Sequence, residues 1–263
     1  MFSFPQMEHR DFVSAYLTGK GVEIGAFKTP IPGIRPTYVD RFGEYAGEPT
    51  LAEYYGDACE LPFEDDSLDF IATSHVLEHV ANPLAALKEW HRALRHGGIV
   101  YMVVPDRAVT FDRLRALTSV SHLLDDFRKG VTQVDGTHID DFVFGVDWKL
   151  FSPNTPASEE KQARETLAEN YRRSVRSGLE INIHFHTFER ASAVEMIAAG
   201  NAAKLWEGKI QVIESVERFP SSNPNGFLLI ARVLKPWTTR LAASFSKKGL
   251  KPDARKFAPP AAK

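Results

Sequence analysis

The chain has 263 residues, of which 43% are hydrophobic and 11% aromatic, an ordinary composition for a globular domain. Its 32 basic and 34 acidic residues give a formal net charge of −2, which argues against general affinity for nucleic acid. The single cysteine, Cys59, excludes an internal disulfide framework and suits a reducing, cytoplasmic compartment. We see no signal peptide and no run of about 20 apolar residues that would span a membrane.

Five short apolar segments within residues 21–105 predict strands: GVEIG, TYVD, EYYGDA, SLDFIATSH and GGIVYMVVP. The segment NPLAALKEWHRALRHGG between the last two predicts a helix. Pro83 suits its first turn, an apolar stripe runs to Leu94, and Gly97 and Gly98 suit its end. Strands separated by helices predict a mostly parallel sheet with right-handed crossovers.

The second half of the domain differs from the first. About residues 107–180 are polar and helix-rich, with loops expected around GTHIDDFVFG and SPNTP, and we interpret them as a cap inserted over one edge of the sheet. A helix is expected over about 188–199, with Thr187 as its N-cap. KIQVIESVERF and NGFLLIARVL predict two strands, and the short PSSNPNG connection favours an antiparallel hairpin. We therefore assign residues 1–235 to a single domain.

Residues 236–263 form a distinct C-terminal segment, basic except for Asp253. This composition predicts a flexible tail. Trp237, Leu241 and Phe245 recur at helical spacing beside lysines, which also favours weak contact with a membrane surface or a partner.

Carboxylates stand at the ends of the first three predicted strands. Glu23 lies in the first, Asp40 closes the second and Asp57 closes the third. Ligands of open α/β sheets bind outside the carboxyl ends of the strands, where a carboxylate can accept hydrogen bonds from ribose hydroxyls. The loop at Gly25 lacks the further glycines that let the backbone approach a pyrophosphate. A phosphate-free adenosine ligand with an ammonium group, such as S-adenosylmethionine, therefore fits better than a nicotinamide dinucleotide.

The segments VEIGAF, YVDRF and GDACELPFEDDSLDFIATSHVLEHVANPLAALKEWHRALRHGGIVYMVVPD resemble class I S-adenosylmethionine-dependent methyltransferases of the small-molecule and glycan group. HFHTFERASAVEMIAAGN is similar to the element before the last strand pair of that family. The resemblance implies an α/β, Rossmann-like fold: a seven-stranded, mostly parallel sheet of order 3-2-1-4-5-7-6 with strand 7 antiparallel. The cap sequence resembles a subgroup from bacterial glycan loci, which implies polysaccharide biosynthesis.

The resemblance also implies which residues hold S-adenosylmethionine. Nine residues at the ends of the first four strands are expected to contact it: Glu23, Gly25 and Ala26 at the methionine end, Asp40 and Arg41 at the ribose, Asp57 and Ala58 at the adenine, and Ser74 and His75 beneath the sulfonium. This set agrees with the carboxylates that the strand ends provide.

Histidines are the candidates for catalysis, because methyl transfer to a hydroxyl benefits from a general base near neutral pH. His75 follows the fourth strand, and His138 lies in the acidic segment DGTHIDDF. His184 and His186 flank Phe185, and an extended segment would turn both toward one face. Histidines and nearby aspartates are metal-ligand types, but we expect hydrogen bonds to acceptor hydroxyls and no bound metal.

Together these features predict an S-adenosylmethionine-dependent O-methyltransferase acting on a hydroxyl of a sugar or glycan-like acceptor. Two alternatives stay open. The chain can be a non-catalytic S-adenosylmethionine-binding regulator or scaffold. It can also methylate another small molecule or nucleic acid, although the near-neutral charge makes nucleic acid the less favoured partner.

Overall fold

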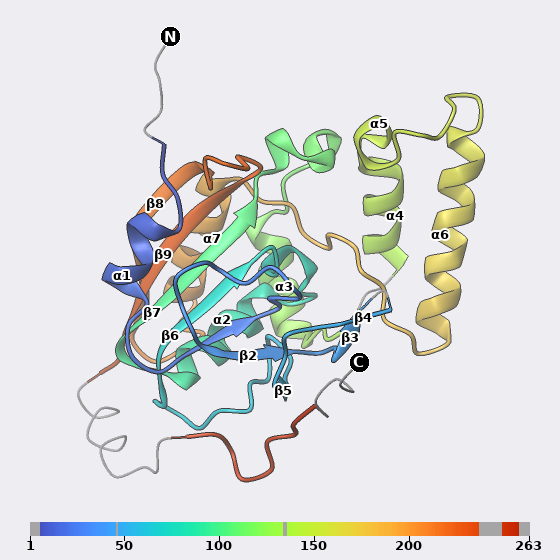
Figure 1. Ribbon diagram of the computed structural model, residues 1–263. Coiled ribbons are helices and arrows are strands. Elements are labelled where there is room, and N and C mark those ends of the chain that lie inside the picture. The colour runs from blue at the N-terminus through green and yellow to red at the C-terminus, as the bar shows by residue number, and fades with distance from the viewer. Residues whose placement is uncertain (1–5, 46, 134–135, 237–248, 258–263) are drawn as a thin grey trace.

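The computed structural model of the protein describes residues 6–45, 47–133, 136–236 and 249–257. A seven-stranded sheet runs through the centre of the molecule (Figure 1). Its strands are β1 (Gly21–Ile24), β2 (Thr37–Asp40), β5 (Tyr54–Tyr55), β6 (Leu68–Ser74), β7 (Leu94–Pro105), β8 (Lys209–Phe219) and β9 (Gly226–Leu234).

The strand order is β5-β2-β1-β6-β7-β9-β8. Two further short strands, β3 (Glu44–Tyr45) and β4 (Glu48–Pro49), pair only with each other. Numbered without them, the central sheet has the predicted order 3-2-1-4-5-7-6. Its last strand in sequence, β9, runs antiparallel to both β7 and β8, while the other neighbouring pairs are parallel. The predicted fold class is confirmed.

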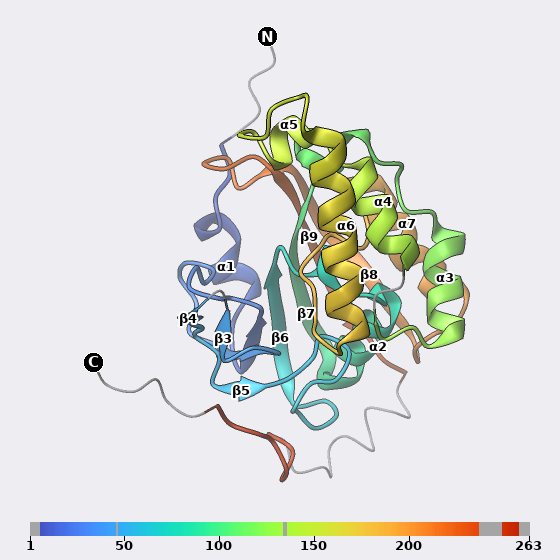
Figure 2. The same ribbon diagram turned by 90° about the vertical axis from the view of Figure 1, so that its right-hand side faces the viewer.

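Helices cover both faces of the sheet, which explains why most residues of its central strands β1, β6 and β7 are buried. α2 (Pro83–Ala93), α3 (Val120–Lys129) and α7 (Arg190–Ala202) lie on one face, and α1 (Arg10–Tyr16) lies on the other (Figure 2). Along β7, Met102 belongs to the core under α2 and α7, whereas Tyr101 and Val103 belong to the core under α1. Alternate side chains of β7 therefore pack into the cores on opposite faces of the sheet.

The cap consists of helical segments, as expected: η2 (Arg107–Val109), η3 (Phe111–Leu114), α3, α4 (Gly136–Gly145), α5 (Trp148–Phe151) and α6 (Glu160–Arg176). α4 and α6 stand beyond the carboxyl ends of the parallel strands (Figure 1). The segment GTHIDDFVFG forms α4, so the loop expected there was wrong. Ile139, Phe142 and Val143 share a helical face and are buried in a separate cap core.

Two predicted helix boundaries also need correction. α2 ends at Ala93, and Leu94 starts β7, where it is fully buried and pairs with Leu68. Thr187 is not the N-cap of the last helix, because its hydroxyl donates to the Ala116 carbonyl at 2.6 Å. α7 begins instead with a capping box between Glu189 and Ser192.

Part of the C-terminal segment packs on the domain. Residues 249–257 follow the edge strand β5, where Lys256 bridges to Tyr54 and its ammonium lies 5.1 Å from the Tyr54 ring centre. A flexible tail was expected here. Trp237, Leu241 and Phe245 lie outside the described residues. Within the described parts of the chain, no helix is long and apolar enough to cross a membrane.

Candidate functional site

Glu23 supplies a buried carboxyl group to the end of β1. Its side chain is 1% exposed, and its Oε1 accepts a hydrogen bond from the Ile31 N–H at 2.9 Å. Its Oε2 is buried and has no hydrogen-bond partner among the described residues. Burial raises the pKa of Glu23 to about 7. A buried oxygen with spare hydrogen-bonding capacity suits an ammonium group, such as that of a bound methionine moiety.

The loop after β1 turns sharply at Gly25, which has a φ of +70°. A Cβ atom on this residue would lie 2.6 Å from Cγ2 of Val76, so a side chain is excluded both by conformation and by contact. Ala26 follows and is buried. The loop therefore brings backbone, without intervening side chains, against the segment that follows β6.

Asp40 ends β2 and is partly buried, which raises its pKa. Its Oδ1 accepts from the Phe42 N–H at 3.2 Å. The neighbouring Arg41 forms ion pairs with Asp57, at 3.0 Å, and with Glu180 of the cap. Asp57 also accepts from the Cys59 N–H through its other oxygen, at 2.6 Å. Asp57 and Arg41 are thus engaged within the protein, and Asp40 is the carboxylate of this edge that best fits a ribose hydroxyl.

The Asp57 loop is itself fixed by α2. The Trp90 indole N–H donates to the Ala58 carbonyl at 2.9 Å, and the Cys59 thiol lies 3.6 Å from the Asn82 carbonyl. Burial raises the pKa of Cys59, so this thiol packs and does not act as a nucleophile. The position of Ala58 beside the expected adenine site thus depends on contacts between the loop after β5 and the region of α2.

His75 sits directly after Ser74, the last residue of β6, and has a φ of +54°. This left-handed conformation is uncommon for a residue with a side chain and is found often at functional sites. Its N–H donates to the Val103 carbonyl at 2.9 Å, which holds the turn against β7. The short helix η1 (Leu77–His79) follows and places Glu78 and His79 beside it.

Glu78 is the centre of this group. It is 1% exposed, and its Oε1 lies 3.7 Å from His75 Nδ1 and 3.6 Å from His79 Nε2. Burial raises the pKa of Glu78 to about 7 and lowers that of His79 to about 4. The Glu78 carbonyl accepts from the Phe185 N–H at 2.7 Å. This bond ties η1 to residues 179–188, which we call the strap.

The strap delivers His184 to the same place. His184 Nδ1 lies 2.5 Å from Asp112 Oδ2, and the His184 ring lies 4.8 Å from the ring of His79. Arg115, which is buried, binds the other Asp112 oxygen at 2.7 Å and also pairs with Asp141. Burial alone would raise the pKa of Asp112, but the His184 hydrogen bond and the Arg115 charge hold it below its usual value.

His186 and His138 lie elsewhere. His186 is buried, its Nε2 lies 3.3 Å from the Ala81 carbonyl, and burial lowers its pKa to about 3. The His138 ring lies 5.5 Å from that of His186. The expectation that His184 and His186 share one face was wrong, because the strap is not a regular strand. Of the four candidate bases, the structure brings together His75 and His184 and places the other two in a separate cluster.

The cofactor edge and the histidine group form one continuous site. Gly25 packs against Val76, which lies between His75 and Glu78 in the chain. One ligand-type atom from each of Glu78, His79 and His184 lies within 4.8 Å of the others. The sequence missed Asp112, because nothing in its local pattern shows that it contacts a histidine far along the chain.

Residues 34–102 match a protein family described as a methyltransferase domain. Over these residues the chain is similar to a methyltransferase domain, and its sheet has the strand order expected of the class I fold. The family match and the sheet order agree with the expected enzyme class, for which S-adenosylmethionine is the expected cofactor. The buried Glu23 oxygen and the Gly25 turn are compatible with the methionine end of this cofactor.

Among curated relatives, the chain is 36% identical over 97 residues to an uncharacterized 37.1 kDa protein in a transposon of Streptomyces fradiae, a match that covers 34% of this chain and 28% of the relative. It is 50% identical over 46 residues to a demethylmenaquinone methyltransferase of Staphylococcus aureus, covering 18% and 19%. The chain thus spans less than a third of the length of these relatives.

Two solved structures are also similar. A S-adenosylmethionine-dependent methyltransferase from Methanosarcina mazei has 18% identity and a TM-score of 0.47, over 90% of this chain and 100% of the other. A possible histamine N-methyltransferase from Thermotoga maritima has 18% identity and a TM-score of 0.45, over 86% and 87%. The fold assignment therefore rests on the sheet order.

Proposed function

We propose that the protein transfers a methyl group from S-adenosylmethionine to a hydroxyl of a sugar or glycan-like small molecule. The observation that carries this proposal is the hydrogen-bonded pair of Asp112 and His184 beside the cofactor edge. S-adenosylmethionine supplies an electrophilic methyl group when bound. The chain must then hold the acceptor within about 3–3.5 Å of the methyl carbon and accept the proton of its hydroxyl.

His184 is the base in this proposal, and Asp112 positions it. When Asp112 accepts the Nδ1–H of His184, the lone pair of the neutral imidazole is on Nε2, where it can take a proton. Arg115 keeps Asp112 in place and ionised. General-base assistance of this kind contributes roughly 10²- to 10⁴-fold to a rate. His75, at the strained end of β6, is the second imidazole that can bind the acceptor.

The choice of a sugar acceptor rests on the cap sequence and on the need for a base, since alcohol hydroxyls are poor nucleophiles when neutral. A quinol-like ring is the second candidate, because one relative is named a demethylmenaquinone methyltransferase. The two acceptors give different products. Methylation of a sugar creates an O–CH₃ bond, whereas methylation of a quinol ring carbon creates a C–CH₃ bond.

An acceptor panel tests the proposal directly. Purified protein with S-adenosylmethionine is offered free sugars, nucleotide-linked sugars, phenols, quinols and oligonucleotides, and release of S-adenosylhomocysteine is measured. We expect turnover with the sugar classes and an O-methyl signal in the NMR spectrum of the product. Turnover confined to quinols or to oligonucleotides would show that the acceptor belongs to that class and is not a sugar. Cofactor binding by calorimetry without turnover in any class would favour the regulatory or scaffold function.

The proposal includes a cytoplasmic location, which the single cysteine suits.

It also includes weak contact between the basic residues of 236–263 and a membrane surface. Replacing Lys247 and Lys248 with Glu should lower sedimentation with vesicles of anionic phospholipid. Equal sedimentation of both proteins would reject the membrane contact and leave the enzyme assignment untouched.

A further inference from the structure

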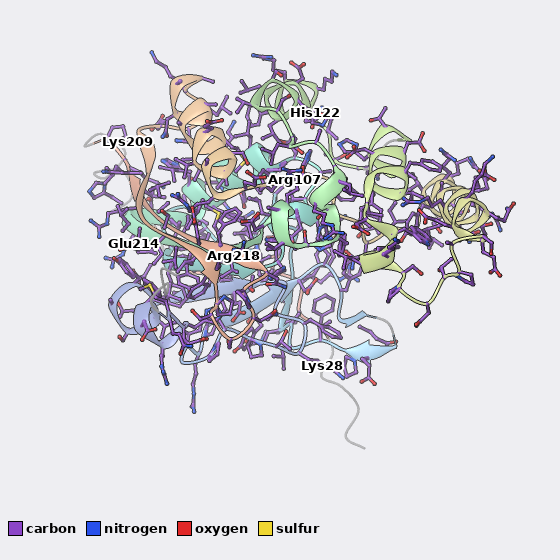
Figure 3. The ribbon with its side chains drawn as sticks, turned by 90° about the horizontal axis from the view of Figure 1, so that it is seen from above. Lys28, Arg107, His122, Lys209, Glu214 and Arg218 are labelled. Carbon is purple, nitrogen blue, oxygen red and sulfur yellow. The ribbon has the colours of Figure 1, made fainter. Side chains whose placement is uncertain are left out.

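A second cluster of metal-ligand side chains lies between the cap and the domain, outside the methyl-transfer site. It contains His122 and Asp126 of α3, His138 of α4 and His186 of the strap. One nitrogen or carboxylate oxygen from each residue lies within 4.8 Å of the corresponding atoms of the others. Figure 3 shows the position of His122 on α3. The four side chains come from three segments, so the cluster is made by the fold.

The three imidazole rings are arranged almost symmetrically. The ring centres of His122 and His138 are 5.4 Å apart, those of His138 and His186 are 5.5 Å apart, and those of His122 and His186 are 5.6 Å apart. The planes are inclined by 55°, 90° and 61°, so none of the rings stack. Three edge-on rings at equal distances can direct one nitrogen each toward a common centre.

His186 gives the clearest indication of a ligand. Its Nε2 lies 3.3 Å from the Ala81 carbonyl, which can only accept, so this nitrogen carries the proton. The lone pair is then on Nδ1, which is buried and has no hydrogen-bond partner among the described residues. A histidine that binds a metal through one nitrogen usually donates from the other to a backbone carbonyl or carboxylate, as His186 does here.

Asp126 completes the donor set. It lies four residues after His122 on one face of α3, and its Oδ2 is 3.1 Å from His122 Nε2. Asp126, His138 and His186 are 4%, 5% and 1% exposed, whereas the His122 side chain is 43% exposed. Burial of the Asp126 carboxylate is costly because it removes a charge from water, and a cation at the centre of the cluster would offset this cost.

We infer that His122, Asp126, His138 and His186 form a zinc site. Three imidazoles and one carboxylate suit Zn²⁺, and four protein ligands leave no open position, as in structural sites. Tetrahedral Zn–N bonds of 2.0–2.1 Å place ligand atoms about 3.3 Å apart, so side-chain shifts of about 1 Å close the cluster. The ion would fasten α3, α4 and the strap to one another. Through the strap, it would fix the position of His184.

Metal content and affinity test this site. Protein stripped with a chelator is titrated with ZnCl₂ against a chromogenic competitor, and we expect one tightly bound equivalent. His122→Ala and Asp126→Asn should each weaken binding at least tenfold. Because the His122 side chain is partly exposed, His122→Ala should still fold and bind S-adenosylmethionine, which circular dichroism and calorimetry check. Co²⁺ in place of Zn²⁺ should give the intense visible absorption of four-coordinate cobalt, and His122→Ala should reduce it.

Two control variants test whether zinc binds at this cluster and not at another site. Asp125→Asn changes an exposed neighbour on α3 that pairs with Arg128 at 2.7 Å, and it should leave zinc affinity unchanged. His79→Gln disrupts the other group of ligand types, around Glu78, and should also leave it unchanged. The site is overturned if the protein binds no zinc, if His122→Ala and Asp126→Asn bind it as well as the parent protein, or if His79→Gln alone abolishes binding. None of these readouts depends on methyl transfer.

Discussion

His184 Nδ1 and Asp112 Oδ2 lie 2.5 Å apart, although 72 residues separate the two positions in the chain. The contact joins the strap to the short helix η3 of the cap. Arg115, bound to the same aspartate, is fully buried, so the pair is held on its far side as well. A histidine fixed by a buried carboxylate beside the cofactor edge has the arrangement that a general base requires.

Replacement of either residue should slow catalysis while leaving cofactor binding intact. We expect His184→Ala to lower kcat by about 10²-fold or more, because the acceptor proton then has no base. Asp112→Asn should lower it by a smaller factor, since the imidazole remains but its orientation is lost. Steady-state release of S-adenosylhomocysteine measures kcat, and calorimetry should show an unchanged Kd for S-adenosylmethionine.

The acidity of the acceptor provides a control on this interpretation. A more acidic hydroxyl needs less help from a base, so the loss caused by His184→Ala should shrink along a series of increasingly acidic acceptors. Added imidazole should restore part of the activity of this variant. The same fractional loss with all acceptors, together with no rescue, would show that His184 has only a structural role.

Much of the fold could be predicted from the sequence, because the patterns that indicate strands and helices lie within short segments of the chain. Alternating apolar segments and their spacing predicted the strands, and Glu23 and Asp40 could be placed because a strand end determines where its next residues lie. The Asp112–His184 contact could not be predicted in this way. It depends on how the cap folds back onto the domain, and the cap's helices carry no periodic signal that fixes that geometry. For the same reason, His122 was not singled out.

The pH dependence of stability should reveal the buried carboxyl group of Glu23. The pKa of Glu23 is about 7 in the folded protein, whereas its ordinary value, which applies to the unfolded chain, is 4.5. Between pH 4.5 and pH 7, folding is therefore accompanied by the uptake of a proton at Glu23. The stabilising contribution of the protonated form is present below about pH 4.5 and is lost as the pH rises through 7. Glu23→Gln removes this loss and should raise the free energy of unfolding at pH 8 by about 1–3 kcal/mol relative to the parent protein.

Cofactor binding should respond in the opposite direction. The Glu23 carboxylate, and not the neutral acid, attracts an ammonium group, so the affinity for S-adenosylmethionine should fall as the pH drops below 7. The Tyr38 and Tyr101 phenols interact with this carboxyl group, and both have raised pKa values, so they stay neutral over this range. Denaturant unfolding and calorimetry at pH 5.5 and 8 measure both effects. A Glu23→Gln variant that binds with the parent's affinity and pH dependence would refute the assignment.

Asp40→Ala should weaken S-adenosylmethionine binding by more than tenfold. The reason is the loss of an acceptor for ribose hydroxyls, since the nearby Asp57 is already engaged by Arg41 and by its own loop. Asp65→Ala removes a carboxylate that pairs with Arg92 on the exposed surface, and it serves as the matched control with an unchanged Kd. Calorimetry measures the Kd of both variants for S-adenosylmethionine. If the two values are equal, Asp40 does not bind the ribose.

Gly25→Ala tests the turn that brings the cofactor loop against the histidine group. The new Cβ would lie 2.6 Å from Val76 Cγ2, and alanine disfavours a φ of +70° by about 1 kcal/mol. We expect lower stability and weaker S-adenosylmethionine binding. Val76→Ala in the same chain removes the clash but not the backbone strain, so the double variant should recover part of the stability measured by denaturant unfolding. The double variant can also prove no more stable than Gly25→Ala while Val76→Ala alone leaves stability unchanged. In that case the backbone conformation, and not the contact with Val76, is the reason for glycine at position 25.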